Sequence, residues 1–187
     1  MSGTPETVAL LAIVFVPMLI EARRADRNER VQLARGGIEP PGDVYRVMRI
    51  AYPGVFLAMI AEGAWRRAPA QAFAQLDSEF AMVFVAVSEV AIAGFFLFLL
   101  AKALKWWAIV SLGPAWTFRV IVVPGDAPIA GGPYAWLRHP NYVGVVGELV
   151  GVALMSGARM SGPVGTLAFC ALMLRRIAVE NRALHRA

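Results

Sequence analysis

The chain is organised around residues 131–144, which read GGPYAWLRHPNYVG. Pro140 suits the first position of a helix, because its missing N–H costs nothing there and its fixed φ is already helical. His139 would then cap that helix, with Arg138 just before it. The unpaired N–H groups and partial positive charge of a helix start, together with Arg138, make a seat for a carboxylate or a phosphate. The alternative is a polar turn between two membrane helices whose arginine contacts lipid head groups.

The remaining composition is that of a membrane protein. The 187 residues are 58% hydrophobic, and a mean hydropathy of +0.60 does not suit a soluble domain. The net charge of +5 does not indicate a nucleic-acid partner, because the arginines lie between apolar segments rather than along one face. Cys170 is the single cysteine and lies in an apolar run, which excludes a disulfide within the chain and argues against a thiolate metal site.

Five apolar segments predict an all-α, polytopic integral membrane protein. The third is the longest and, at a rise of about 1.5 Å per residue, crosses a hydrocarbon core of about 30 Å. The last two are joined by a tight turn and form a C-terminal helical hairpin. We expect residues 1–104 to form a three-helix membrane region, and residues 105–187 to hold the motif loop, the hairpin and a C-terminal segment. The five segments are 7–20, 47–65, 80–104, 142–156 and 163–179.

The segments between the spans also carry expectations. No basic residue precedes the first apolar run and no small-residue cleavage site follows it, so it is interpreted as a retained helix rather than a signal peptide. Residues 21–46 are expected to extend that helix and then to form a loop, because two glycines and two prolines interrupt their second half. Residues 118–123 are interpreted as a short strand.

The distribution of basic residues predicts the orientation in the membrane. Segments 21–46, 102–141 and 175–187 lie on one side and carry 6, 4 and 4 basic residues. The other side has only three, and such an asymmetry places the richer side in the cytosol. The amino terminus would then be outside, and the motif and the carboxyl terminus cytosolic. The preference for arginine over lysine indicates a GC-rich, bacterial genome and hence an inner-membrane protein.

Glu148 is the first candidate for chemistry outside the motif. In a helix that starts at Pro140, it shares one face with Asn141, Gly144 and Gly151. A carboxylate at that depth in a membrane is costly and is a functional candidate by default. The alternative is a structural partner for a nearby arginine.

Arg176 and Glu180 are the second candidates, since they form an i,i+4 pair on the last helix, beside Asn181. They would lie at the cytosolic mouth of the hairpin. The motif and this pair therefore belong to the same side of the membrane.

The motif and the C-terminal residues together follow a known pattern. Arg138-His139-Pro140 is followed by Tyr142, then by a helical hairpin, and then by a glutamate. This arrangement resembles the isoprenylcysteine carboxyl methyltransferase family, which is akin to the phospholipid methyltransferases. The resemblance covers residues 102–187, and the first three spans match only in being membrane helices. Its residues are Gly132, Pro133, Tyr134, Arg138, His139, Pro140, Asn141, Tyr142, Gly144, Arg176, Glu180, Asn181 and Leu184.

The resemblance implies a membrane enzyme that uses S-adenosylmethionine in a pocket on the cytosolic side, without the soluble Rossmann-type methyltransferase fold. The helix start, Arg138 and His139 suit the methionine carboxylate of the cofactor. Glu180 suits its amino group or a ribose hydroxyl, and should close the pocket together with Asn181. The residues expected to line the pocket are Tyr134, Arg138, His139, Pro140 and Tyr142.

The methyl acceptor stays open between two classes. Asn181 stands where many family members have a second glutamate, and the usual aromatic, basic tail does not follow it. A lipophilic acceptor is expected in either case, either a prenylcysteine carboxylate or a small lipid-like oxygen acid such as an alkylpyrone.

The predicted function is therefore S-adenosylmethionine-dependent O-methyl transfer to a lipophilic acceptor in the bilayer. Methyl transfer from a sulfonium needs in-line positioning and exclusion of water. Glu148, as base or orienting group, and Arg176 are the candidate catalytic residues. Two alternatives are an NADPH-dependent membrane reductase of the sterol-reductase type and a non-catalytic membrane scaffold. The oligomeric state is left open.

Overall fold

The computed structural model describes residues 5–73, 78–127 and 129–184 and is built from helices, as predicted. Four of the helices are long and apolar enough to cross a membrane, and α4 is a shorter apolar helix of 17 residues. Two short 3₁₀ helices, η1 and η2, precede α4. The elements are α1 (Pro5–Ala34), α2 (Tyr45–Phe73), α3 (Ser78–Leu112), η1 (Gly113–Ala115), η2 (Gly132–Ala135), α4 (Pro140–Ser156) and α5 (Ser161–Leu184).

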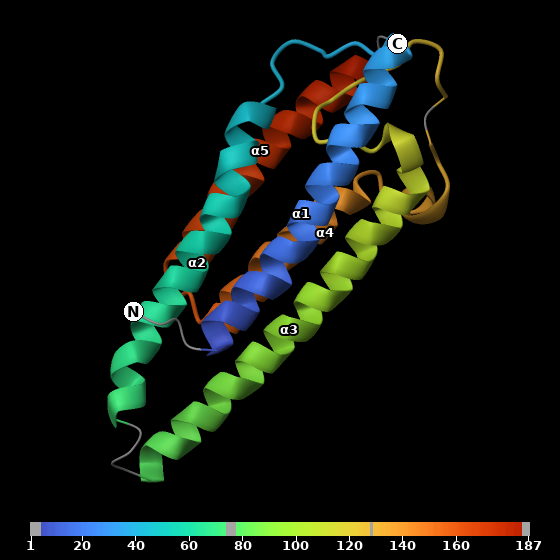
Figure 1. The fold of residues 1–187 in the computed structure, drawn as a ribbon. Coiled ribbons are helices and arrows are strands. Elements are labelled where there is room, and N and C mark those ends of the chain that lie inside the picture. Colours follow the sequence, from blue (N-terminus) through green and yellow to red (C-terminus); the bar gives the residue numbers. More distant parts are fainter. Residues whose placement is uncertain (1–4, 74–77, 128, 185–187) are drawn as a thin grey trace.

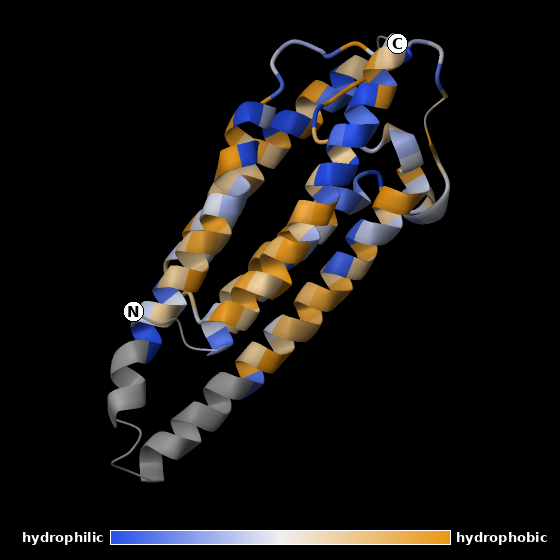
Figure 2. Cartoon of the chain, viewed as in Figure 1, coloured by the Kyte–Doolittle hydropathy of each residue, from blue (hydrophilic) through white to orange (hydrophobic). Residues whose placement is uncertain are grey.

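Successive helices run up and down beside one another, so that the polar connections gather at one end (Figure 1). The 35–44 connection, the segment between η1 and η2, the start of α4 and the end of α5 all lie at this end. Hydrophilic residues gather there, whereas hydrophobic residues cover most of the helices further down (Figure 2). The motif and the end of α5 therefore share one face, as the sequence predicted.

The first helix continues well past its apolar run. It ends at Ala34, and Ala25, Asn28 and Gln32 in its second half are buried. The predicted helical extension after Ile20 is confirmed, and it packs into the polar end of the molecule rather than projecting into water.

Close packing of α3 against α4 depends on small residues. A Cβ on Gly151 would lie 2.9 Å from the carbonyl oxygen of Gly94, and one on Gly147 would lie 2.7 Å from Cβ of Ala101. Both distances are shorter than ordinary contacts, so the glycines let the two helices approach. Gly147 and Gly151 therefore serve helix packing.

Both ends of α4 follow from local sequence. Pro140 takes the first helical position and His139 is the N-cap residue, as predicted, without a side-chain capping bond. Gly157 ends the helix in the left-handed conformation at φ 70°, where a residue with a Cβ is disfavoured. The carboxylate of Glu62 in α2 then accepts the backbone N–H groups of Met160 and Ser161, which begin the next helix.

The predicted strand at residues 118–123 is wrong. Within the described segments, Val122 forms only an isolated antiparallel bridge with Ile38. The N–H of Val120 donates instead to the carboxylate of Asp43, at 2.9 Å. A side chain thus satisfies a backbone group that a second strand would otherwise have to pair.

We expect the polar end to be cytosolic. Ala127 is exposed at that end and Met160 is exposed at the other. With Cys170 replaced by Ala, the Met160→Cys variant should react with an impermeant maleimide in intact cells. The Ala127→Cys variant should react only after permeabilisation, because the basic asymmetry places it inside. Labelling of both from the same side, or the reverse pattern, would contradict this topology.

Gly151→Ala should destabilise the protein, because its new Cβ meets backbone of α3 and forces the helices apart. Overpacking of this kind costs about 1–3 kcal/mol, and a lower midpoint of thermal unfolding in detergent would report it. Gly54→Ala is the matched control, since a Cβ there meets nothing within 4 Å. Equal midpoints for the two variants would show that the α3–α4 approach does not need Gly151.

Candidate active site

A cavity of 1020 Å³ opens among the helices toward the polar end. It is bordered by α1, α2, the end of α3, the start of α4, α5, and the segments on both sides of η2. Its walls change character along their length. Phe15, Met18 and Leu19 of α1 line one part, whereas Asp26 and Gln32 from the same helix line another. The cavity is therefore apolar toward the bilayer and polar toward its mouth.

Seven of the nine predicted site residues line this one cavity. Two do not: Pro140 is buried at the start of α4, and Glu148 is buried deeper along the same helix. The residues that converge on the cavity come from the motif and from α5, which are separated by about 40 positions in the chain. They are Tyr134, Arg138, His139, Tyr142, Arg176, Glu180 and Asn181.

The hydroxyl of Tyr142 links Arg176 to Glu180. Nε of Arg176 donates to the hydroxyl oxygen at 2.9 Å, and the hydroxyl donates to Oε2 of Glu180 at 2.9 Å. Arg176 and Glu180 are thus joined through the tyrosine, and the described contacts do not include the direct i,i+4 pair that their spacing predicts. Nη1 of Arg176 also lies 3.7 Å from Oδ1 of Asp43, a partner that sequence reasoning missed.

Tyr134 lies close enough to this group to sense its charge. Burial, and then the carboxylate of Glu180, raise the pKa of the Tyr134 phenol above its usual value. Tyr134 therefore stays protonated at neutral pH and can donate a hydrogen bond into the cavity.

His139 combines a free ring nitrogen with the start of a helix. Its Nε2 is buried and makes no hydrogen bond among the described residues, and its ring lies 5.6 Å from that of Tyr142. The first N–H groups of α4 lie beside it and carry a partial positive charge. This corner of the cavity has the donors that an anionic group needs.

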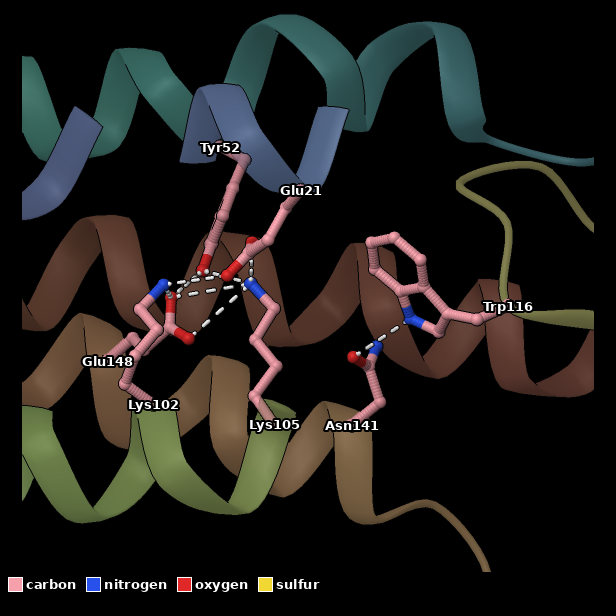
Figure 3. A network of polar contacts seen from close by, with 7 residues as sticks. All are labelled: Glu21, Tyr52, Lys102, Lys105, Trp116, Asn141 and Glu148. Atoms are coloured by element: carbon pink, nitrogen blue, oxygen red, sulfur yellow. Dashed lines mark hydrogen bonds and ion pairs between the residues drawn. The ribbon is translucent and has the colours of Figure 1, made fainter. Parts of the chain in front are cut away.

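Trp116 connects α1 to the motif through two hydrogen bonds. Nδ2 of Asn28 in α1 donates to the carbonyl of Trp116 at 2.7 Å, and the indole Nε1 donates to Oδ1 of Asn141 at 3.4 Å. The second of these bonds is drawn in Figure 3. The start of α4 is therefore held in place from α1 through a buried tryptophan.

A family comparison bears directly on these residues. Residues 92–186 match the model of the isoprenylcysteine carboxyl methyltransferase (ICMT) family. The chain belongs to the ICMT family. Membership implies a membrane methyltransferase, and every motif residue that lines the cavity lies within the match.

Relatives from two bacteria match nearly the whole chain without naming a substrate. An "Uncharacterized protein YpbQ" from Bacillus subtilis is 26% identical over 94% of this chain and 94% of its own. An "Uncharacterized protein" from Haemophilus influenzae is 23% identical over 94% of this chain and 90% of its own. No solved structure matches the chain.

A cluster of buried charges lies next to the cavity of this ICMT-family protein (Figure 3). Nζ of Lys102 lies 3.0 Å from Oε1 of Glu21 and 3.0 Å from Oε2 of Glu148. Nζ of Lys105 lies 2.7 Å from Oε2 of Glu21 and 3.4 Å from Oε2 of Glu148. The hydroxyl of Tyr52 donates to Oε2 of Glu148 at 2.6 Å. Two carboxylates and two ammonium groups thus neutralise one another.

The charge cluster identifies the partners of Glu148. The sequence suggested a base or a partner for an arginine, whereas its observed partners are two lysines and a tyrosine. Glu148 is 1% exposed, yet Lys105 and Tyr52 both line the cavity. Glu148 therefore reaches the cavity only through these neighbours, and its role as a base stays a prediction. Glu21 and Tyr52 lie outside the family match, in α1 and α2.

Replacing one charged member of the cluster should destabilise the protein. Replacing two oppositely charged members together should recover much of the lost stability. Lys105→Met or Glu148→Gln alone leaves an uncompensated charge, and breaking a buried pair costs about 3–5 kcal/mol. The double variant keeps the Glu21–Lys102 pair, so its thermal midpoint in detergent should exceed that expected from adding the single effects. Strictly additive effects would contradict the coupling.

The exposed pair Arg35–Asp126, at 2.9 Å, provides the control for that cycle. Exposed pairs contribute only about 0–1 kcal/mol. Arg35→Met and Asp126→Asn should therefore leave the thermal midpoint almost unchanged.

Proposed function

We propose that the chain is an S-adenosylmethionine-dependent O-methyltransferase embedded in the bacterial inner membrane, acting on a lipophilic acceptor. The observation that carries the proposal is the convergence of motif and α5 residues on one cavity that is polar at its mouth and apolar toward the bilayer. Family membership supplies the reaction class.

The polar residues fit the parts of the cofactor. The start of α4, Arg138 and the unpaired Nε2 of His139 suit the methionine carboxylate. Glu180 suits the cationic amino group or a ribose hydroxyl, and Tyr142 and Arg176 hold it in place. When bound, S-adenosylmethionine supplies a methyl group on a sulfonium. The aromatic rings at this corner can stabilise such a cation.

The apolar part of the cavity fits the tail of the acceptor. Phe15 and Met18 of α1, and Phe169 and Met173 of α5, line it within the hydrophobic zone of the helices. A lipid-like molecule entering from the bilayer would leave its tail there and present its head to the polar mouth. A prenylcysteine carboxylate and an alkylpyrone both have this form.

The acceptor class decides whether a base is needed. A carboxylate is ionised well below neutral pH and is already a nucleophile. A hydroxyl must lose a proton, and Glu148 is the candidate base for that step. Tyr52, which lines the cavity, donates its own hydroxyl to this carboxylate.

The protein should bind S-adenosylhomocysteine and should not bind NADPH. His139→Ala and Glu180→Ala should each raise the dissociation constant about tenfold or more, because each removes a hydrogen bond to a charged group worth about 1.5–3 kcal/mol. Titration calorimetry of the detergent-solubilised protein would measure both nucleotides. Arg182→Ala is the control, since Arg182 is exposed on the same helix as Glu180 and bonds only the carbonyl of Ala178 among the described contacts.

The outcomes separate the alternatives. Binding of NADPH without S-adenosylhomocysteine would favour the reductase, and binding of neither would favour the scaffold. An unchanged affinity for S-adenosylhomocysteine in both the His139 and the Glu180 variant would remove this corner of the cavity as the cofactor site.

A further inference from the structure

Polar atoms without hydrogen-bond partners gather around the cavity. Six buried side-chain atoms in the described part of the chain make no hydrogen bond, and four belong to residues that line this cavity. One is Nε2 of His139, in the proposed cofactor corner. The other three are Oε1 of Glu29, Nε2 of Gln32 and Nε of Arg119. A buried polar atom left unpaired costs about 1–3 kcal/mol, so such a group marks a place where a ligand supplies the partners.

The geometry fixes which atoms are free. Glu29 and Gln32 lie three residues apart on α1, share one helical face, and are 9% and 3% exposed. Oε1 of Gln32 accepts a hydrogen bond from Nη1 of Arg35 at 3.3 Å, which leaves its NH₂ group as a donor. Oε2 of Glu29 lies 3.4 Å from Nε of Arg119, which leaves Oε1 as an acceptor. The wall thus offers one acceptor and one donor side by side.

We infer that Glu29, Gln32 and Arg119 form the binding site for the polar head of the acceptor, and that they select a neutral, hydroxyl-bearing head over a carboxylate. The inference rests on the proposed function. A hydroxyl donates to Oε1 of Glu29, and a neighbouring oxygen on the same head accepts from Nε2 of Gln32. Glu29 and Gln32 both lie outside residues 92–186, so the family match does not assign this site.

Charge explains the selection against a carboxylate. The charge of Arg119 is already compensated, because its Nη1 lies 2.6 Å from Oε1 of Glu39 and its Nε lies 3.4 Å from Oε2 of Glu29. An acceptor carboxylate would be a third anion beside Arg119, and the exposed Asp26 on the same wall adds a fourth, with Arg49 as a second cation on the cavity lining. Like charges repel, and the repulsion is strongest at Glu29, which is buried. A hydroxyl brings no charge and makes the same two hydrogen bonds.

The same helical face continues downward as a site for the tail. Below Glu29, the cavity wall of α1 passes through Ala22 and Leu19 to Phe15. Fourteen residues separate Glu29 from Phe15, which at about 1.5 Å per residue is about 21 Å. One helix therefore contacts both the head and the tail of a single amphipathic molecule.

The test compares two lipids whose heads differ in charge. Protein in nanodiscs is saturated with S-adenosylhomocysteine, and binding of tritiated pentadecylresorcinol (two neutral hydroxyls) or palmitate (a carboxylate) is measured by scintillation proximity. Wild type should prefer the resorcinol. Glu29→Gln should weaken resorcinol binding about tenfold and strengthen palmitate binding, through the loss of one charge-assisted hydrogen bond and of one repelling anion. Gln32→Ala should weaken resorcinol binding alone.

Glu39→Gln is the matched control, because Glu39 is the other carboxylate on Arg119 but does not line the cavity. It should change both lipid affinities by less than about twofold. Equal effects of Glu29→Gln and Glu39→Gln, or a wild type that prefers palmitate, would overturn the inference. Affinity for S-adenosylhomocysteine is measured in every variant. If wild type does not bind S-adenosylhomocysteine, the proposed function is contradicted. If it binds S-adenosylhomocysteine but Glu29→Gln leaves the lipid preference unchanged, only the head site is contradicted.

Discussion

Four charges that meet inside the apolar part of the helix bundle constrain how the helices can be arranged. Removing an ion from water costs several kcal/mol unless partners replace the water, and this requirement is stricter in a membrane. Glu21 comes from α1, Lys102 and Lys105 from α3, and Glu148 from α4, while Tyr52 of α2 donates to the same carboxylate. The charges balance only when α1, α3 and α4 face one another at this depth. The hydrogen bond from Tyr52 to Glu148 adds α2 to this arrangement.

This constraint also shapes the cavity. Lys105 and Tyr52 belong to the cluster and also line the cavity, so the cluster forms part of the cavity wall. At the other end, Tyr142 holds Glu180 and Arg176. Six residues of α4 separate Tyr142 from Glu148, about 9 Å along the helix axis. In the proposed function, the methyl donor and the oxygen acceptor meet between these two polar groups, with the acceptor's tail in the apolar part.

Local patterns in the sequence were enough to predict the helices, the start of α4 at Pro140 and the shared face of the motif and α5. The charge cluster was not predicted, because Glu21 and Lys102 stand at the ends of apolar runs, where charges normally meet water or head groups. The link through Tyr142 and the role of Asp43 at residue 120 were also missed. Each depends on which faces of distant helices come together, and hydrophobic periodicity within one helix carries no information about that.

A structure determined with S-adenosylhomocysteine in a lipid environment tests the central claim most directly. We predict density for the nucleotide in the cavity, with its carboxylate at the start of α4 near His139 and its amino group or ribose near Glu180. We also predict lipid density along the apolar wall between Met18 and Phe169. Nucleotide density outside this cavity, or none at saturating concentration, would contradict the assignment of the cavity as a methyl-transfer site.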